Sequence, residues 1–320
     1  MDTLPQLGTE VMEVLGPTFS AYESLVLANE DKIKSTKRET HAYGPETRQA
    51  LDVYYPDDGA ATPAPFKAKP VLVFLYGGGF VDGDKIKPGY AHDLVFANIG
   101  HYFASRHGFT VIIPNYRLLK HGAVFPSGGQ DVKLVIDWIS TSLAQKPGYD
   151  AVDLFLLGNS VGGIHATTWA FHPDFTESVA NVTATARTGP GVLLRGLMLL
   201  GAPIHFGGDD NEILRAYYGG GPDVIAKNIP LALAEAAKQR AGANLLPGVR
   251  IAQLLSELDP EYLYQSTKDL QDVWPNSEIE TQIIKGHNHI SPQCSLGTGI
   301  EKEEAWGIQV ADFCRSRASS

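Results

Sequence analysis

A five-residue stretch, Gly158-Asn159-Ser160-Val161-Gly162, places the tightest constraint on how this chain can fold. It follows the apolar run Leu154–Leu157 and precedes the helical run Ile164–Phe171, which predicts a strand, a sharp turn and a helix. Such a turn strains its central residue, raises the serine hydroxyl above the sheet and needs small neighbours. We therefore predict that Ser160 is a nucleophile. The alternative is a serine that caps the helix after a glycine turn.

Short apolar segments alternate with segments of helical periodicity from about residue 70 onward, and no internal repeat is present. This alternation predicts an α/β fold, a mostly parallel sheet covered by helices on both faces. Upstream, two segments flank a Gly-Pro turn and predict an antiparallel hairpin, Thr40–Tyr43 and Gln49–Tyr54. The later predicted strands are Val71–Tyr76, Phe109–Pro114, Leu154–Leu157, Gly196–Leu200, Arg250–Leu255 and Glu278–Ile284.

Apolar residues spaced by three and four predict helices between the strands. The clearest stripe consists of Val132, Val135, Ile136, Ile139 and Leu143, and similar stripes lie in Leu94–Phe103 and Trp306–Phe313. Residues 1–320 are expected to form one domain. Two segments do not fit the alternation of strands and helices that forms the sheet and its covering layers. Residues 1–38 are predicted to form amphipathic helices, and residues 206–228 are Gly-rich. We expect them to form a small helical cap; the alternative is peripheral packing.

Charge and cysteine usage exclude some classes of protein. The chain has 26 Lys and Arg against 36 Asp and Glu, a net charge of -10, so no basic surface is expected for nucleic acid. The start, Met1-Asp2-Thr3-Leu4-Pro5, lacks the pattern of a signal peptide, and no apolar run is long enough to span a membrane. With only Cys294 and Cys314, thiols in a reducing compartment are expected. These features predict a cytoplasmic protein.

Three consecutive glycines follow the strand predicted at Val71–Tyr76, in the segment Tyr76-Gly77-Gly78-Gly79-Phe80. Glycine runs cost conformational entropy, which indicates that the backbone itself approaches something closely. We predict that the N–H groups of Gly78, Gly79 and Val161 donate to the oxyanion that develops on an attacked carbonyl. The alternatives are a flexible loop and a phosphate cradle, and the second is disfavoured because the G-x-G-x-x-G spacing is absent and no G-K-[ST] follows.

These motifs together resemble the hormone-sensitive-lipase-like carboxylesterases, the α/β-hydrolase fold-3 group, with their arylformamidase relatives. That family shows H-G-G-G-[FW], then Y-R-L with a downstream Pro and Asp, then G-D-S-A-G-G. This chain has, in the same order, Tyr76-Gly77-Gly78-Gly79-Phe80, Tyr116-Arg117-Leu118, Phe125-Pro126, Asp131 and Gly158-Asn159-Ser160-Val161-Gly162-Gly163. The resemblance covers roughly residues 40–317. It implies an eight-stranded, mostly parallel sheet with a small cap over the active site.

The chain departs from the family pattern at three positions. Tyr76 stands in place of the usual His, Asn159 in place of Asp, and Val161 in place of Ala. None of these changes removes a backbone N–H, so the predicted oxyanion donors remain. The arylformamidase pattern H-G-G-x-W fits Tyr76 and Phe80 poorly, which disfavours a formamidase.

The acid and the base of a catalytic triad follow the serine in this order along such a fold. Asp259 lies just after the strand Arg250–Leu255 and resembles the family's D-P element, so we predict that it is the acid, with Glu257 as the alternative. A helix-capping role is the other interpretation of Asp259. After the last predicted strand, His289 aligns with the family's H-[FI] element and is the predicted base, with His287 as the alternative.

The predicted activity is hydrolysis of a carboxylic ester of a small, largely apolar substrate through an acyl-enzyme. No cofactor or metal is expected, because the two histidines lack further ligands at metal spacing. Tyr76, Phe80, Tyr217 and Tyr218 are tentative substrate-binding residues. The alternatives are an acyltransferase or lactonase, a formamidase or peptidase, and a receptor with little turnover. The oligomeric state is open, with a homodimer as one option.

Overall fold

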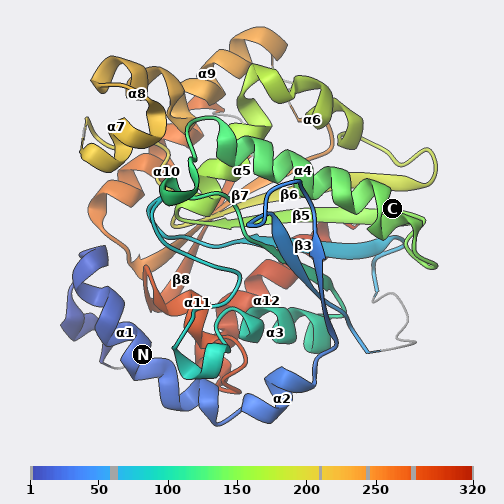
Figure 1. The fold of residues 1–320 in the computed structure, drawn as a ribbon, viewed down its shortest axis with the longest axis vertical. Helices are drawn as coiled ribbons and strands as arrows, with labels where there is room; N and C mark the ends of the chain where they lie inside the picture. Colours follow the sequence, from blue (N-terminus) through green and yellow to red (C-terminus); the bar gives the residue numbers. More distant parts are fainter. Residues whose placement is uncertain (1–2, 58–63, 209–210, 243–245, 275–278, 319–320) are drawn as a thin grey trace.

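One twisted sheet runs through the centre of the molecule in the computed structural model (Figure 1). The structure describes residues 3–57, 64–208, 211–242, 246–274 and 279–318. Over this part of the chain the sheet has eight strands in the order β1-β2-β4-β3-β5-β6-β7-β8. Strand β2 is antiparallel to both of its neighbours, and all other pairs are parallel. The predicted hairpin and the mostly parallel sheet are therefore confirmed.

Strands β5, β6 and β7 extend further than their predicted apolar runs, whereas β2 and β4 begin one residue later than predicted. The strands are β1 Arg38–Ala42, β2 Ala50–Tyr54, β3 Lys69–Leu75, β4 Thr110–Pro114, β5 Ala151–Asn159, β6 Gly191–Leu200, β7 Arg250–Leu258 and β8 Ile279–Asn288. Strand β8 continues past the predicted end at Ile284 because its ladder with β7 resumes after a register shift, where Leu258 pairs with Asn288. Glu278, the predicted first residue of this strand, lies outside the described residues.

The helices form between the strands, largely where the periodicity predicts them. They are α1 Val11–Leu27, α2 Glu30–Ser35, α3 Ala97–His107, α4 Ser127–Thr141, α5 Val161–Phe171, α6 Thr176–Val182, α7 Glu212–Tyr218, α8 Pro222–Asn228, α9 Pro230–Ala241, α10 Glu261–Val273, α11 Ser291–Ser295 and α12 Glu301–Ser316. Leu143, the last residue of the predicted stripe, lies in a separate 3-10 turn after α4.

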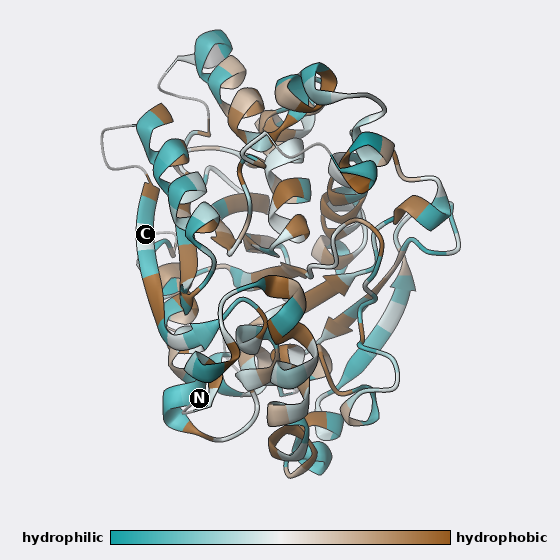
Figure 2. Cartoon of the chain, turned by 90° about the vertical axis from the view of Figure 1, so that its left-hand side faces the viewer, coloured by the Kyte–Doolittle hydropathy of each residue, from teal (hydrophilic) through white to brown (hydrophobic). Residues whose placement is uncertain are grey.

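The two faces of the sheet carry two separate hydrophobic cores. Because side chains alternate along a strand, Val71, Val73 and Leu75 of β3 join one core while Leu72 and Phe74 join the other. Helices α4, α5, α9 and α10 cover the first face, and α3 and α12 cover the second (Figure 1). Figure 2 shows the hydrophobic colour concentrated in the central strands and on the helix surfaces that face them.

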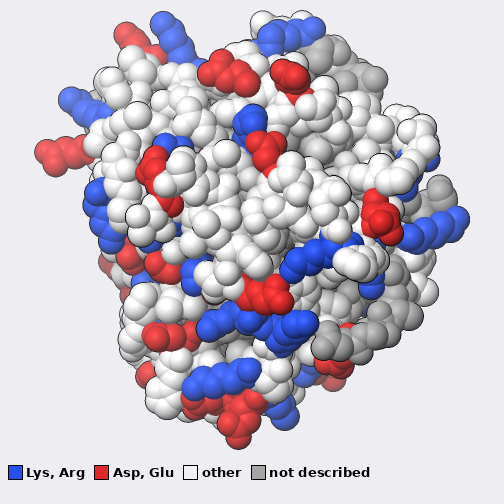
Figure 3. Space-filling model, turned by 45° about the vertical axis from the view of Figure 1, so that its right-hand side comes forward, with Lys and Arg blue, Asp and Glu red and all other residues white. Residues whose placement is uncertain are grey.

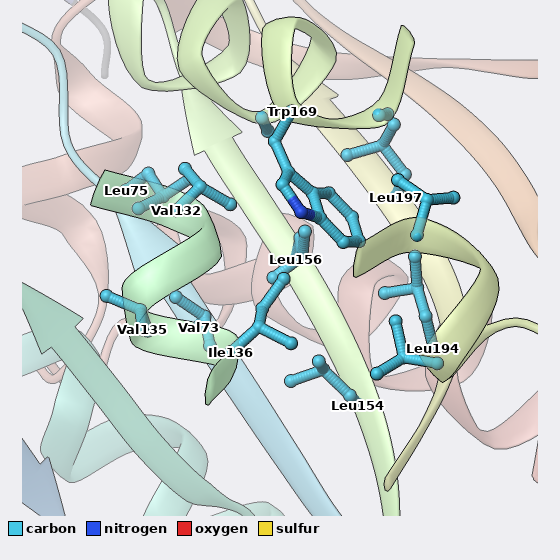
Figure 4. Close-up of a cluster of buried hydrophobic side chains, with 14 of the residues drawn as sticks. Val73, Leu75, Val132, Val135, Ile136, Leu154, Leu156, Trp169, Leu194 and Leu197 are labelled. Carbon is cyan, nitrogen blue, oxygen red and sulfur yellow. The ribbon is translucent and has the colours of Figure 1, made fainter. Parts of the chain in front are cut away.

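The first core is centred on a buried tryptophan. Figure 4 shows the indole of Trp169 pointing from α5 toward Leu156 and Leu197 of the sheet. Trp169 is fully buried, and its indole N–H donates to Ser178 Oγ at 3.1 Å. The ring therefore fills the space between α5 and the sheet and also satisfies its polar atom.

Truncation of this side chain is expected to be costly. Trp169→Ala should lower the free energy of unfolding by about 3–5 kcal/mol, because it removes a large buried ring and leaves a cavity. Urea denaturation followed by circular dichroism measures this loss. Ile308→Ala is a matched control, since Ile308 is 43% exposed and its truncation should change stability by less than about 0.5 kcal/mol. An equal loss in both variants would contradict this account of the core.

The two segments expected to form a cap lie in different places. Helix α1 packs against α11 and residues 91–93, with Val14 and Tyr22 buried beside Ile290 and Cys294. Helices α7 and α8 lie at the upper left of Figure 1, apart from α1 at the lower left. Leu214, Tyr217 and Tyr218 of α7 pack onto Phe80. The segment 206–228 thus covers the loop that carries the glycine run.

Charged side chains are distributed over the surface without a broad area of one sign on the face shown in Figure 3, where Lys and Arg alternate with Asp and Glu. Among the described residues, none of the helices combines the length and the apolar character that crossing a membrane requires.

Candidate active site

Four neighbouring strands bring the predicted catalytic residues to one edge of the sheet. Strands β5, β6, β7 and β8 are adjacent and parallel, so their carboxyl ends lie side by side. Ser160 follows β5, Asp259 follows β7 and His289 follows β8. The Ser160 N–H donates to Leu200 O at 2.8 Å, and the Gly201 N–H donates to Leu254 O at 2.8 Å. These bonds fix the ends of the strands relative to one another.

Ser160 sits on the predicted sharp turn between β5 and α5. Its φ of 50° and ψ of -122° are strained values for a residue with a side chain. The surrounding glycines leave no room for larger residues. A Cβ on Gly162 would lie 2.1 Å from the Leu75 carbonyl oxygen, and one on Gly158 would lie 2.5 Å from Gly163 Cα. The structure thus has the crowded turn that the sequence pattern predicts.

The structure pairs Asp259 with His289. Asp259 Oδ1 lies 2.8 Å from His289 Nδ1, and Asp259 Oδ2 accepts a hydrogen bond from the Ser256 N–H at 2.8 Å. Both residues are buried. A carboxylate only accepts hydrogen bonds, so in this contact the imidazole donates from Nδ1, and Nε2 is the ring nitrogen left for another partner.

The alternative acid and base lie in other contacts. Glu257 is exposed and binds the Lys285 ammonium at 3.0 Å and the Gly286 N–H at 2.8 Å. These two donors hold the pKa of Glu257 below its usual value. His287 is buried, with Nδ1 at 2.8 Å from Ser291 Oγ, and burial lowers its pKa to about 4.

Gly201 occupies the space beside the His289 ring. A Cβ on Gly201 would lie 3.0 Å from both His289 Cε1 and Nδ1. Among the described residues, Ser160 Oγ and His289 form no hydrogen bond. In hydrolases with a catalytic triad, the corresponding bond often tightens only when substrate binds.

The glycine run lies beside the serine. A Cβ on Gly77 would be 3.1 Å from Ser160 Cβ, which shows how closely the loop approaches the elbow. Gly78 and Gly79 have φ values of 138° and 59°, in the region that favours glycine. Val161 begins α5, so its N–H has no acceptor within the helix. The three predicted oxyanion donors therefore belong to backbone that borders Ser160.

A hollow of about 510 Å³ opens at Ser160, a size typical of small-molecule sites. Its described lining residues are Gly79, Phe80, Ser160, Val161, Pro203, Phe206, Asn211, Ile213, Leu214 and Tyr262. Charged side chains are absent from this lining. A separate hollow of about 420 Å³ between α5, α6 and α9 has no predicted site residue among the residues described around it.

The four tentative substrate-binding residues divide into two groups. Phe80 lines the hollow, whereas Tyr217 stacks behind it with ring centroids 4.0 Å apart, and Tyr218 packs beside both. Tyr76 is fully buried, and its hydroxyl donates to Asn115 Oδ1 at 2.8 Å. Tyr76 is not among the described lining residues of the hollow.

Sequence reasoning did not name six lining residues, Pro203, Phe206, Asn211, Ile213, Leu214 and Tyr262. Four of them belong to the segment 206–228, whose unusual composition was the available signal. Tyr262 lies three residues after Asp259, and this closeness to the predicted acid was the only signal for it. The described residues contain no group of three or more His, Cys, Asp or Glu side chains that could hold a metal ion.

Comparison with known proteins supports the fold described above. Residues 51–188 match the model of the BD-FAE family, a span that contains the glycine run and the serine turn. Esterase B from Lactobacillus rhamnosis is similar over 96% of this chain and 97% of its own, with a TM-score of 0.62 and 16% identity. A truncated carbohydrate esterase from gut microbiota is similar over 88% of this chain and 96% of its own, with a TM-score of 0.60 and 17% identity.

A hyperthermophilic esterase from the archeon Pyrobaculum calidifontis is also similar, with a TM-score of 0.56 and 18% identity over the whole of this chain and 97% of its own. These matches agree with the predicted class of enzyme, the carboxylesterase-type hydrolases. Assignment to the hormone-sensitive-lipase-like group is finer than these matches and stays a prediction. The chain has the α/β-hydrolase fold, and the part of it that carries the serine turn is similar to the BD-FAE family.

Proposed function

We propose that this chain is a serine carboxylesterase in which Ser160 is the nucleophile, His289 the base and Asp259 the acid. The observation that carries the proposal is the 2.8 Å hydrogen bond between Asp259 and His289. It lies at the same end of the sheet as Ser160, and Ser160 lines a pocket. The esterase names of the similar structures support the same class of reaction.

The first half of the reaction transfers the acyl group to the enzyme. Ser160 Oγ attacks the ester carbonyl carbon while His289 Nε2 accepts the hydroxyl proton, and Asp259 stabilises the resulting imidazolium. The carbonyl oxygen becomes negative and accepts hydrogen bonds from the Gly78, Gly79 and Val161 N–H groups. The bond to the alcohol oxygen then breaks, and the alcohol leaves with the proton from Nε2.

The second half releases the acid. Water takes the place of the alcohol and gives a proton to His289 Nε2 as its oxygen attacks the acyl carbon. The second tetrahedral adduct collapses, the bond to Ser160 Oγ breaks, and Oγ recovers its proton from Nε2. The same three backbone donors serve both adducts.

The pocket supports a small, largely apolar ester as substrate. Phe206, Ile213 and Leu214 supply apolar walls, and the described lining offers no charged partner for a carboxylate or an ammonium on the substrate. The described part of segment 206–228 acts as the cap in this proposal, because Phe206, Ile213 and Leu214 line the same pocket as Ser160. Helix α1 contributes to the cap only indirectly, through its packing beside the loop of His289.

A panel of p-nitrophenyl esters with acyl chains from acetyl to dodecanoyl tests the proposal. We expect turnover with short and medium chains, and covalent labelling of the folded protein by a fluorophosphonate probe at Ser160. Mass spectrometry of the labelled peptide identifies the residue. A folded protein that neither hydrolyses any ester in the panel nor reacts with the probe would refute the proposal.

A further inference from the structure

The loop that carries the glycine run has an unusual backbone. Gly78, Gly79 and Phe80 have φ values of 138°, 59° and 67°, three consecutive residues in the left-handed region. Phe80 has a side chain, so its conformation costs free energy that other contacts must offset. The loop therefore keeps this conformation only if neighbouring residues stabilise it. The residues packed beneath it provide these contacts.

Tyr76 is the first of these residues. Its ring is stacked between Phe96 and Tyr116, with centroid separations of 5.5 Å and 4.6 Å. Its hydroxyl donates to Asn115 Oδ1 at 2.8 Å and accepts from Arg48 Nη2 at 3.1 Å. Burial raises the pKa of Tyr76, which keeps the hydroxyl protonated and able to donate. The Tyr116 hydroxyl in turn donates to the Tyr76 carbonyl at 2.7 Å.

Arg48 completes a network of hydrogen bonds at the end of the loop formed by Gly83 and Asp84. It lies in the turn between β1 and β2, and its side chain is only 13% exposed. Its guanidinium donates to the Tyr116 carbonyl at 2.9 Å, to Asp84 Oδ2 at 3.1 Å and to the Gly83 carbonyl. Asp84 Oδ1 also accepts from Asn115 Nδ2 at 3.0 Å. Two guanidinium nitrogens of Arg48 and the side-chain amide of Asn115 thus donate to Gly83 and Asp84, where the loop returns.

Where the loop turns back, at Gly83, its backbone packs directly against the Tyr76 ring. A Cβ on Gly83 would lie 2.5 Å from Tyr76 Cε2, and one on Gly78 would lie 2.0 Å from the Asp82 carbonyl oxygen. The two arms of the loop are therefore packed against each other and against the Tyr76 ring. A shift of Gly83 or Asp84 would be transmitted to Gly78, whose N–H is one of the proposed oxyanion donors.

We propose that Arg48 and Tyr76 are positioning residues, which hold the N–H groups of Gly78 and Gly79 at the geometry that the oxyanion requires. This inference rests on the proposed function of the site. Preorganised donors stabilise the transition state because their orientation costs nothing at the moment of reaction, and a loosened loop loses that advantage. Neither residue is among those that line the pocket, so ground-state binding should not depend on them.

Arg48→Met is the principal test, because methionine keeps an apolar stem and removes the guanidinium. We expect kcat for p-nitrophenyl butyrate to fall about 10- to 100-fold, less than or equal to the loss of a complete oxyanion donor, with KM changed less than about threefold. The affinity for butylboronic acid, which forms a tetrahedral adduct with a serine hydroxyl, should fall by a similar factor.

Tyr76→Phe is the second variant, since it removes one hydroxyl and keeps the stacked ring. We expect kcat to fall about 2- to 10-fold, the effect of one hydrogen bond. Arg48→Lys should recover part of the Arg48→Met loss, because lysine restores the charge without the planar fork. All assays are made well below the melting temperature of each variant, with the folded fraction measured by circular dichroism.

Arg106→Met is the matched control. Arg106 pairs with the buried Glu304 at 2.5 Å, away from the glycine loop, so its loss should lower stability without lowering kcat. Folded Arg48→Met and Tyr76→Phe proteins with wild-type kcat and boronate affinity would overturn the inference, as would a loss confined to KM. The proposed function itself fails if Ser160→Ala keeps the wild-type turnover. That assay is made before the Arg48 and Tyr76 variants, so the two failures are distinguishable.

Discussion

Replacing Ser160 with alanine is expected to lower kcat toward a short activated ester by about 10⁴–10⁶-fold. In the proposed mechanism the hydroxyl oxygen of Ser160 forms the acyl-enzyme, and no other serine is among the described lining residues of the pocket. The strained turn is defined by its glycines and its backbone, so the variant should fold like the native protein. Burst-phase and steady-state release of p-nitrophenol measure the loss.

A loss of label accompanies the loss of turnover in this prediction. Ser160→Ala should no longer react with a fluorophosphonate, and its far-ultraviolet circular dichroism and melting temperature should match those of the native protein. Turnover that persists within tenfold of wild type in a folded variant would mean that Ser160 is not the nucleophile.

Asp259→Asn is expected to lower kcat by about 10⁴-fold. Asp259 Oδ2 accepts the Ser256 N–H, so the carboxamide oxygen of asparagine should take that place and turn its NH₂ group toward His289 Nδ1. An NH₂ group can only donate, which moves the imidazole proton to Nε2. Nε2 could then no longer accept the proton of Ser160. Steady-state kinetics at pH 7–9 with the same ester measures the effect.

Glu257→Gln is the matched control for Asp259→Asn. Glu257 lies two residues away, is exposed and binds Lys285 and the Gly286 N–H, outside the contact with His289. A glutamine oxygen can still accept from Gly286, so kcat should stay within about twofold of wild type. A large loss of kcat in Glu257→Gln with little loss in Asp259→Asn would mean that Glu257, and not Asp259, is the acid.

The sequence predicted the elements that local pattern determines. The strand, turn and helix around Ser160 could be predicted because a parallel strand buried on both faces is apolar throughout, and because the crowded turn needs glycine at Gly158 and Gly162. The choice of Asp259 over Glu257 followed only from resemblance. The structure adds a physical difference, since one carboxylate meets the imidazole and the other meets an ammonium.

The remaining features depend on contacts between distant segments. Tyr76 is a tentative substrate-binding residue by sequence, and its hydroxyl is held by Arg48 and Asn115, which are 28 and 39 residues away in the sequence. The amphipathic pattern of residues 1–38 indicates that α1 buries one face but not which surface covers it. That surface turns out to be α11 and its flanking residues.

The walls of the pocket and the reacting groups come from separate parts of the chain. Strand ends and the glycine loop supply the proposed chemistry, whereas the segment from Pro203 to Leu214, inserted after β6, supplies most of the apolar wall. Exchange of that insertion could therefore redirect the choice of ester and leave the reaction itself intact. A library confined to these few positions would explore new substrates at little risk to the hydrolytic machinery.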